Sequence, residues 1–103
     1  THNNHPAQIA FRAARDAMNV IDHKLDAMDP TEECLAEFEA IEAEWDRLAA
    51  LEYQAGTELI RWAWSVLQSA PGAEEVRPAV EAALAGRPAA RLRFIKLAER
   101  MSA

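Results

Sequence analysis

The chain has 103 residues, of which 50% are hydrophobic but only 7% aromatic, and its 17 acidic and 11 basic side chains give a formal net charge of −6. This length suits a single small domain with a thin core, which leaves apolar surface uncovered unless a partner covers it. A single cysteine excludes an internal disulfide, and no apolar run approaches the roughly 20 residues needed to span a bilayer, so we expect a cytoplasmic protein.

The charge is divided unevenly along the chain. Residues 1–55 hold twelve acidic and four basic side chains, a net charge of −8, whereas residues 56–103 hold five and seven, a net charge of +2. An acidic first half does not favour nucleic acid, while the basic C-terminal segment can meet phosphate or an acidic protein surface. The richness in alanine, arginine and glutamate resembles that of proteins from GC-rich bacterial or phage genomes.

The first predicted element is a helix over residues 6–28, preceded by residues 1–5, which we expect to fray. Strand signals are nearly absent along the whole chain, so the predicted fold class is all-α. Pro6 suits the first turn of this helix, with Asn4 or His5 as its cap. Apolar residues then recur at alternating spacings of four and three, in a heptad seam made of Ala7, Phe11, Ala14, Met18, Ile21, Leu25 and Met28.

A second helix is predicted from the sequence DPTE, residues 29–32. Asp29 can cap the helix, Pro30 suits its first turn and Glu32 can reach back as in a capping box. The heptad spacing resumes after this turn in a second seam made of Cys34, Phe38, Ile41, Trp45, Leu48, Glu52 and Ala55. Folding the chain about the turn makes an antiparallel αα-hairpin in which opposed residues have numbers that sum to 59. Small Ala14 then faces bulky Trp45, as interdigitation requires.

Gly56 decides whether the second helix is one long element over residues 30–69 or two helices. The seam passes Gly56 without a change of phase, and a glycine inside a helix costs about 1 kcal/mol relative to alanine, less than the loss of a packed turn. The preceding turn contains Glu52, which has the wrong charge for a helix C-terminus. We therefore expect one helix, with a bend at Gly56 or a break before Thr57 as the alternatives. A continuous helix predicts that Gly56→Ala raises stability.

Two short helices are predicted over residues 73–85 and 88–101. They can cover only one side of the stretch LIRWAWSVL, which is apolar nearly all round and should therefore be buried on every side. The predicted core or dimer-seam residues are Trp45, Leu59, Trp62 and Val66. The hairpin pairing leaves the last three beyond the first helix, so we expect a second copy of the chain to cover them in a dimeric helical bundle.

No spacing in the chain matches a catalytic, cofactor or metal motif. There is no glycine-rich phosphate loop, nucleophile elbow or Cys-x-x-Cys, and no Glu-x-x-His pair of the kind that binds metals in helical bundles. We therefore expect no enzyme activity, no cofactor and no metal site. The carboxylates of the second helix are either a solvated face or an acidic docking surface for another protein, with Glu33, Glu37 and Glu44 as the candidate contacts.

Two functional hypotheses follow from these patterns. The first is a small non-enzymatic protein–protein interaction module, a homodimer that acts as an adaptor, regulator or inhibitor through the acidic helix face. The alternative is a nucleic-acid-associated regulator that uses the basic C-terminal helix, where Phe94 could stack on a base beside phosphate contacts. The cations of that helix, which could equally form a solvated or ion-paired face, are Arg87, Arg91, Arg93, Lys96 and Arg100.

Overall fold

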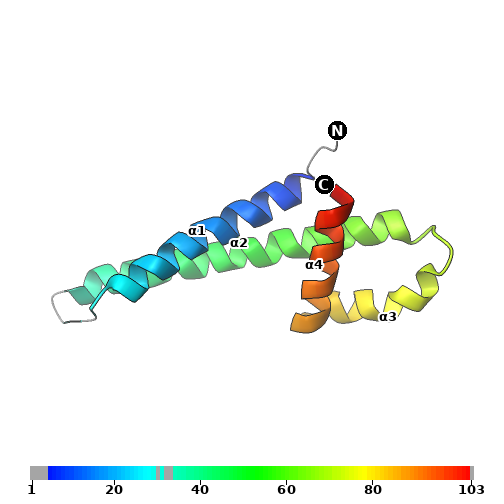
Figure 1. Ribbon diagram of the computed structural model, residues 1–103. Coiled ribbons are helices and arrows are strands. Elements are labelled where there is room, and N and C mark those ends of the chain that lie inside the picture. The colour runs from blue at the N-terminus through cyan, green and yellow to red at the C-terminus, as the bar shows by residue number, and fades with distance from the viewer. Residues whose placement is uncertain (1–4, 30, 32–33, 103) are drawn as a thin grey trace.

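The computed structural model describes residues 5–29, 31 and 34–102, and these residues form four helices and no strand (Figure 1). The helices are α1 (Pro6–Ala27), α2 (Leu35–Leu67), α3 (Ala73–Leu84) and α4 (Pro88–Ser102). The predicted all-α class is therefore confirmed. None of the helices in these described ranges combines the length and the apolar composition needed to cross a membrane.

The start of α1 is more ordered than the sequence predicts. The Nδ1 atom of His5 accepts a hydrogen bond of 3.1 Å from the backbone N–H of Ala7, so the imidazole caps the helix that Pro6 begins. The His5 ring also lies against the Trp62 ring, with 5.0 Å between the ring centroids. His5, for which the sequence predicts fraying, thus has contacts with both α1 and α2 in the structure. Residues 1–4 lie outside the described residues.

The connection between α1 and α2 is longer than the predicted turn. The N-cap residue of α2 is Cys34 rather than Asp29, whose carbonyl accepts a hydrogen bond of 2.7 Å from the N–H of Thr31. The α-helix begins only at Leu35, after a half-buried Cys34 that makes no side-chain cap. The predicted contributions of Pro30 and Glu32 fall on residues outside the described part of the chain.

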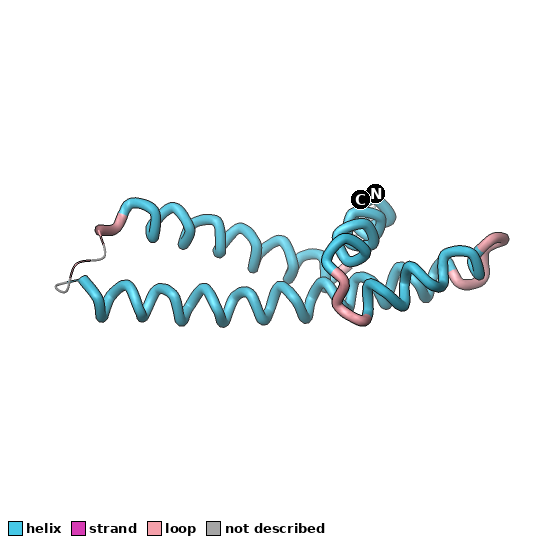
Figure 2. The backbone as a smooth tube through the Cα atoms, turned by 90° about the horizontal axis from the view of Figure 1, so that it is seen from below, coloured by secondary structure: helices cyan, strands magenta, loops and turns pink. Residues whose placement is uncertain are grey.

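Helices α1 and α2 lie side by side and run in opposite directions (Figures 1 and 2), but their register is not the predicted one. His5 stacks on Trp62, and Asp22 and Trp45 line the same hollow. The numbers in both pairs sum to 67 rather than 59, so the pairing is displaced by about eight residues, or about two helical turns. Trp45 therefore does not face Ala14. The longer connection allows this displacement, because the first turn of α2 extends past the end of α1 and has no residue of α1 opposite it.

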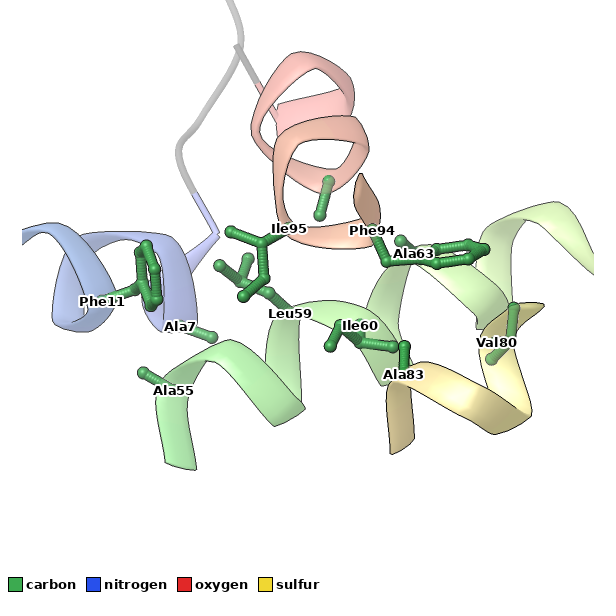
Figure 3. Close-up of a cluster of buried hydrophobic side chains, with 11 residues drawn as sticks. Ala7, Phe11, Ala55, Leu59, Ile60, Ala63, Val80, Ala83, Phe94 and Ile95 are labelled. Atoms are coloured by element: carbon green, nitrogen blue, oxygen red, sulfur yellow. The ribbon is translucent and has the colours of Figure 1, made fainter. Parts of the chain in front are cut away.

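The core lies where all four helices meet, and Figure 3 shows its side chains. Leu59 is fully buried between Ala7 and Phe11 of α1 and Ile95 of α4, so it needs no second copy of the chain to cover it. The remaining members of this core are Ala55, Ile60, Ala63, Val80, Ala83, Phe94 and Ala98. Of the other predicted seam residues, Trp62 is half-buried and Val66 is 52% exposed. Only part of the stretch that was expected to be buried on every side is therefore enclosed.

Away from this core, α1 and α2 continue as a two-helix arm, which we define as α1 from Asp16 onward, the connection, and α2 up to Arg47 (Figure 2). The molecule is elongated as a result, with extents of 60 × 31 × 16 Å. The apolar seam of the arm is only half-buried, because two helices alone cannot enclose it. These half-buried residues include Met18, Ile21, Leu25, Phe38, Ile41 and Trp45.

Gly56 lies inside the continuous helix α2, and the only glycines with positive φ in the described ranges are Gly72 and Gly86. Gly56 is buried because α4 crosses α2 at this point. A Cβ atom at Gly56 would lie 2.9 Å from Nη2 of Arg91 and 3.1 Å from Cδ1 of Ile95. The glycine therefore serves the close approach of two helices rather than a helix end.

We expect Gly56→Ala to lower the free energy of unfolding by about 1 kcal/mol, because the strain of the added methyl group exceeds the gain in helix propensity. This reverses the sign that the sequence predicts, since the sequence treats position 56 as an ordinary helical site. Chemical unfolding followed by circular dichroism measures the difference. A more stable alanine variant would contradict the close packing of α4 on α2.

Candidate functional site

Two of the three carboxylates predicted to dock a partner, Glu37 and Glu44, lie on the described part of α2. Glu37 is exposed and makes no ion pair among the described residues. Glu44 is exposed and bound by Arg47, whose Nε donates a hydrogen bond of 2.9 Å and whose Nη2 donates a second. These hydrogen bonds lower the pKa of the Glu44 carboxyl. Glu33 lies outside the described residues.

A different set of carboxylates gathers on the arm. Asp22, Glu42 and Asp46 line a hollow of about 300 Å³ between α1 and α2, together with the apolar side chains of Leu25 and Trp45. We call this feature the acidic hollow. None of its three carboxylates forms an ion pair with a side chain in the described ranges. The hollow therefore concentrates negative charge beside half-buried apolar surface.

Helical spacing and register together build the acidic hollow. Asp22 and Leu25 are three residues apart on α1, and Glu42 and Asp46 are four apart on α2, so each pair lies on one side of its helix. The observed register then brings Asp22 to Trp45. In the predicted register Trp45 would lie about two turns away along α1, and the hollow would not form. The sequence shows the spacing but not this juxtaposition.

One polar atom of Trp45 is buried within the arm. This atom, Nε1 of the indole, has no hydrogen-bond acceptor among the described residues. An N–H group buried in this way is unfavourable by about 1–3 kcal/mol relative to a satisfied one.

The acidic hollow suits an organic cation more than any other ligand class. A guanidinium or ammonium group can pair with carboxylates and lie against an indole ring, and both interactions strengthen when water is partly excluded. In the described part of the chain, no three His, Cys, Asp or Glu side chains lie in an arrangement that could hold a metal ion. The chemistry of the hollow thus points to Arg or Lys side chains of another polypeptide.

The basic helix α4 differs from its predicted role at Arg91, which is buried in the interface with α2. Its Nη1 donates to Oγ1 of Thr57 and its Nη2 donates to the carbonyl of Tyr53, each at 2.9 Å. The guanidinium also lies over the Tyr53 ring, 3.8 Å from its centroid. Arg91 therefore holds α4 on α2 and is not placed to contact phosphate or an acidic partner.

The remaining cations of the predicted basic face stay on the surface. The exposed members are Arg87, Arg93, Lys96 and Arg100. Leu92 is 54% exposed beside them. Phe94, the residue expected to stack on a base, is instead buried in the core. The basic surface of α4 is thus smaller than the sequence predicts, and it does not include the predicted aromatic residue.

Comparison with known proteins adds no relative to this description. No family model, curated protein or solved structure matches the chain. The function proposed below is therefore inferred from the acidic hollow and from the charge distribution of the arm.

Proposed function

We propose that the chain is a small non-enzymatic interaction module of the cytoplasm, which works as a homodimer and as an adaptor, regulator or inhibitor of another protein. Its acidic arm binds a basic segment of that partner. The observation that carries the proposal is the acidic hollow, in which Asp22, Glu42 and Asp46 surround Trp45 without a paired cation from the described residues.

The charge of the whole arm supports the same class of partner. Its described residues, 16–29, 31 and 34–47, include nine acidic and two basic side chains, a net charge of −7. Such a field speeds the encounter with a basic partner and disfavours acidic ones. The half-buried seam adds apolar surface along the same two helices. A helix with arginine or lysine beside apolar residues is therefore the segment that fits the arm.

We expect Asp22→Asn combined with Asp46→Asn to weaken binding of a basic segment by at least about tenfold, because charge-assisted hydrogen bonds to the hollow are lost. The probe is a synthetic amphipathic peptide with arginines on one face, measured by isothermal titration calorimetry at two salt concentrations. The matched control is Glu37→Gln combined with Glu39→Gln, which removes the same charge from exposed positions of the same arm. We expect a loss of about twofold for this control.

The same variants then serve as baits for proteins of the native host. A protein captured by the parent and by the control, but not by the hollow variant, supports the proposed function. Equal losses of binding in the two variants would contradict a role for the hollow. Binding would then depend only on the overall negative charge of the arm. A chain that binds neither the peptide nor a host protein would contradict the proposed function as a whole.

The nucleic-acid alternative has less support, because Arg91 and Phe94 are both used inside the fold. Its remaining support is the exposed basic surface of α4. Binding of a DNA or RNA probe that falls steeply with salt, and that is lost in Arg93→Glu combined with Lys96→Glu, would favour this alternative.

A further inference from the structure

A second surface lies on the opposite side of α1 and α2 from the acidic hollow. Here Ala10, Ala13 and Ala14 of α1 and Leu48, Leu51 and Ala55 of α2 line a mainly apolar groove of about 390 Å³. Helix α4 packs on the other side of the pair, against residues that do not line this groove.

Large apolar side chains of α1 and α2 remain exposed, and one of them, Leu51, lines this groove. Ile9 and Val20 of α1 are 56% and 63% exposed, and Leu51 of α2 is 45% exposed. The alanines that line the groove leave room for the backbone of another helix to approach closely, because they project only a methyl group. The groove therefore has room for a helix from another chain. The charges beside the groove indicate which helix fits it.

The edge of α2 beside the groove carries charges in a regular order. Six exposed residues follow one another at alternating spacings of three and four, which places them along one side of the helix. In chain order they are Glu44, Arg47, Leu51, Gln54, Glu58 and Arg61. Leu51, Gln54 and Glu58 line the groove itself, and the others extend the line in both directions. We call this line the charged edge.

The charged edges of two copies of α2 are complementary when the helices run antiparallel. When two α2 helices run antiparallel with Leu51 opposite Gln54 of the partner subunit, Arg47 faces Glu58 of the partner subunit. Glu44 then faces Arg61 of the partner subunit. A twofold axis repeats both pairs, so four oppositely charged pairs form and no like charges meet. A parallel arrangement in register would instead place each charge opposite the same charge.

We propose that a second copy of the chain occupies this groove, with the two α2 helices antiparallel about a twofold axis between Leu51 and Gln54. The inference rests on the homodimer of the proposed function and assigns its interface to the groove and the charged edge. It replaces the interface that the sequence predicts around Leu59, which the chain buries by itself. The acidic hollow stays open on the other side, so a dimer of this kind can still bind a partner.

A charge exchange tests this register. We expect Glu58→Arg alone and Arg47→Glu alone each to raise the dissociation constant of the dimer about tenfold, because each places like charges opposite one another twice. The two substitutions combined should return the constant to within about threefold of the parent value, since opposite charges again face each other. Within a chain, the variants leave like charges beside Glu44 or Arg61, and combining them does not remove this repulsion. Restoration therefore reports on contacts between chains.

Sedimentation equilibrium over a range of concentrations gives the dissociation constants, and circular dichroism verifies that each variant is helical. The matched control exchanges Glu74 and Arg77, an exposed ion pair on α3, and should leave the constant unchanged. A parent chain that stays monomeric at every concentration overturns the inference. Single reversals without effect, or a double variant that is not restored, also overturn it. A monomeric parent also contradicts the homodimer of the proposed function, whereas a dimer that the reversals do not weaken contradicts this interface alone. The peptide titration tests the acidic hollow separately.

Discussion

Arg91→Ala is expected to lower the free energy of unfolding by about 2–4 kcal/mol, because the substitution removes a buried guanidinium that joins α4 to α2. Arg91 is only 7% exposed and makes two hydrogen bonds to α2, to Thr57 and to the carbonyl of Tyr53. Its contact with the face of the Tyr53 ring is lost as well. Urea unfolding monitored by far-ultraviolet circular dichroism measures the change.

Arg93→Ala is the matched control, since both arginines lie on α4 but Arg93 is exposed. We expect its effect to stay within about 0.5 kcal/mol. Arg91→Lys should give an intermediate loss, because a lysine keeps the charge but cannot reproduce the planar fork of donors. Equal effects of alanine at positions 91 and 93 would show that Arg91 does not hold the two helices together.

Leu59→Ala is expected to lower the free energy of unfolding by about 3–5 kcal/mol, at the upper end for a buried leucine. The site cannot easily collapse around the cavity that the substitution leaves. Leu59 is fully buried, and α1 and α4 pack over it from different directions (Figure 3). Two helices therefore lose contacts at once when the side chain is shortened. The same urea unfolding experiment measures this loss.

The matched control for Leu59 is Val66→Ala on the same helix, at a position that is 52% exposed. We expect a change within about 0.5 kcal/mol for this control. The sequence places both residues on one seam, whereas the structure buries only the first. A loss below about 1 kcal/mol for Leu59→Ala would be too small for a fully buried leucine and would contradict the core described above.

Local chemistry made the helices predictable from the sequence. Pro6 and Pro88 are the first residues of α1 and α4, and Gly72 immediately precedes α3, because these residues act on the backbone close to their own positions. The unbroken heptad spacing through Gly56 likewise predicted the continuous helix that the structure contains. The start of α2 was the exception, since the connection before Leu35 runs longer than its turn signals suggest.

The candidate site could be predicted only in part. The excess of carboxylates on the arm is visible in the sequence, but their gathering around Trp45 depends on the register of α1 against α2. A heptad seam matches itself almost equally well after a shift of about seven residues, so the apolar pattern does not select one register. The sequence therefore indicated an acidic surface, and placed it on Glu33, Glu37 and Glu44 rather than at the hollow.

By itself, the sequence determined the all-α class, most helix ends and the sign of the charge on each half of the chain. Only the tertiary structure decided that Arg91 is buried, that a methyl group at Gly56 would press on Arg91 and Ile95, and that Leu59 is enclosed by one chain. Each of these depends on where α4 crosses α2. Helix signals act over a few residues, whereas the environment of Gly56 is set by side chains of α4, which lie far along the chain and leave no trace in the local pattern.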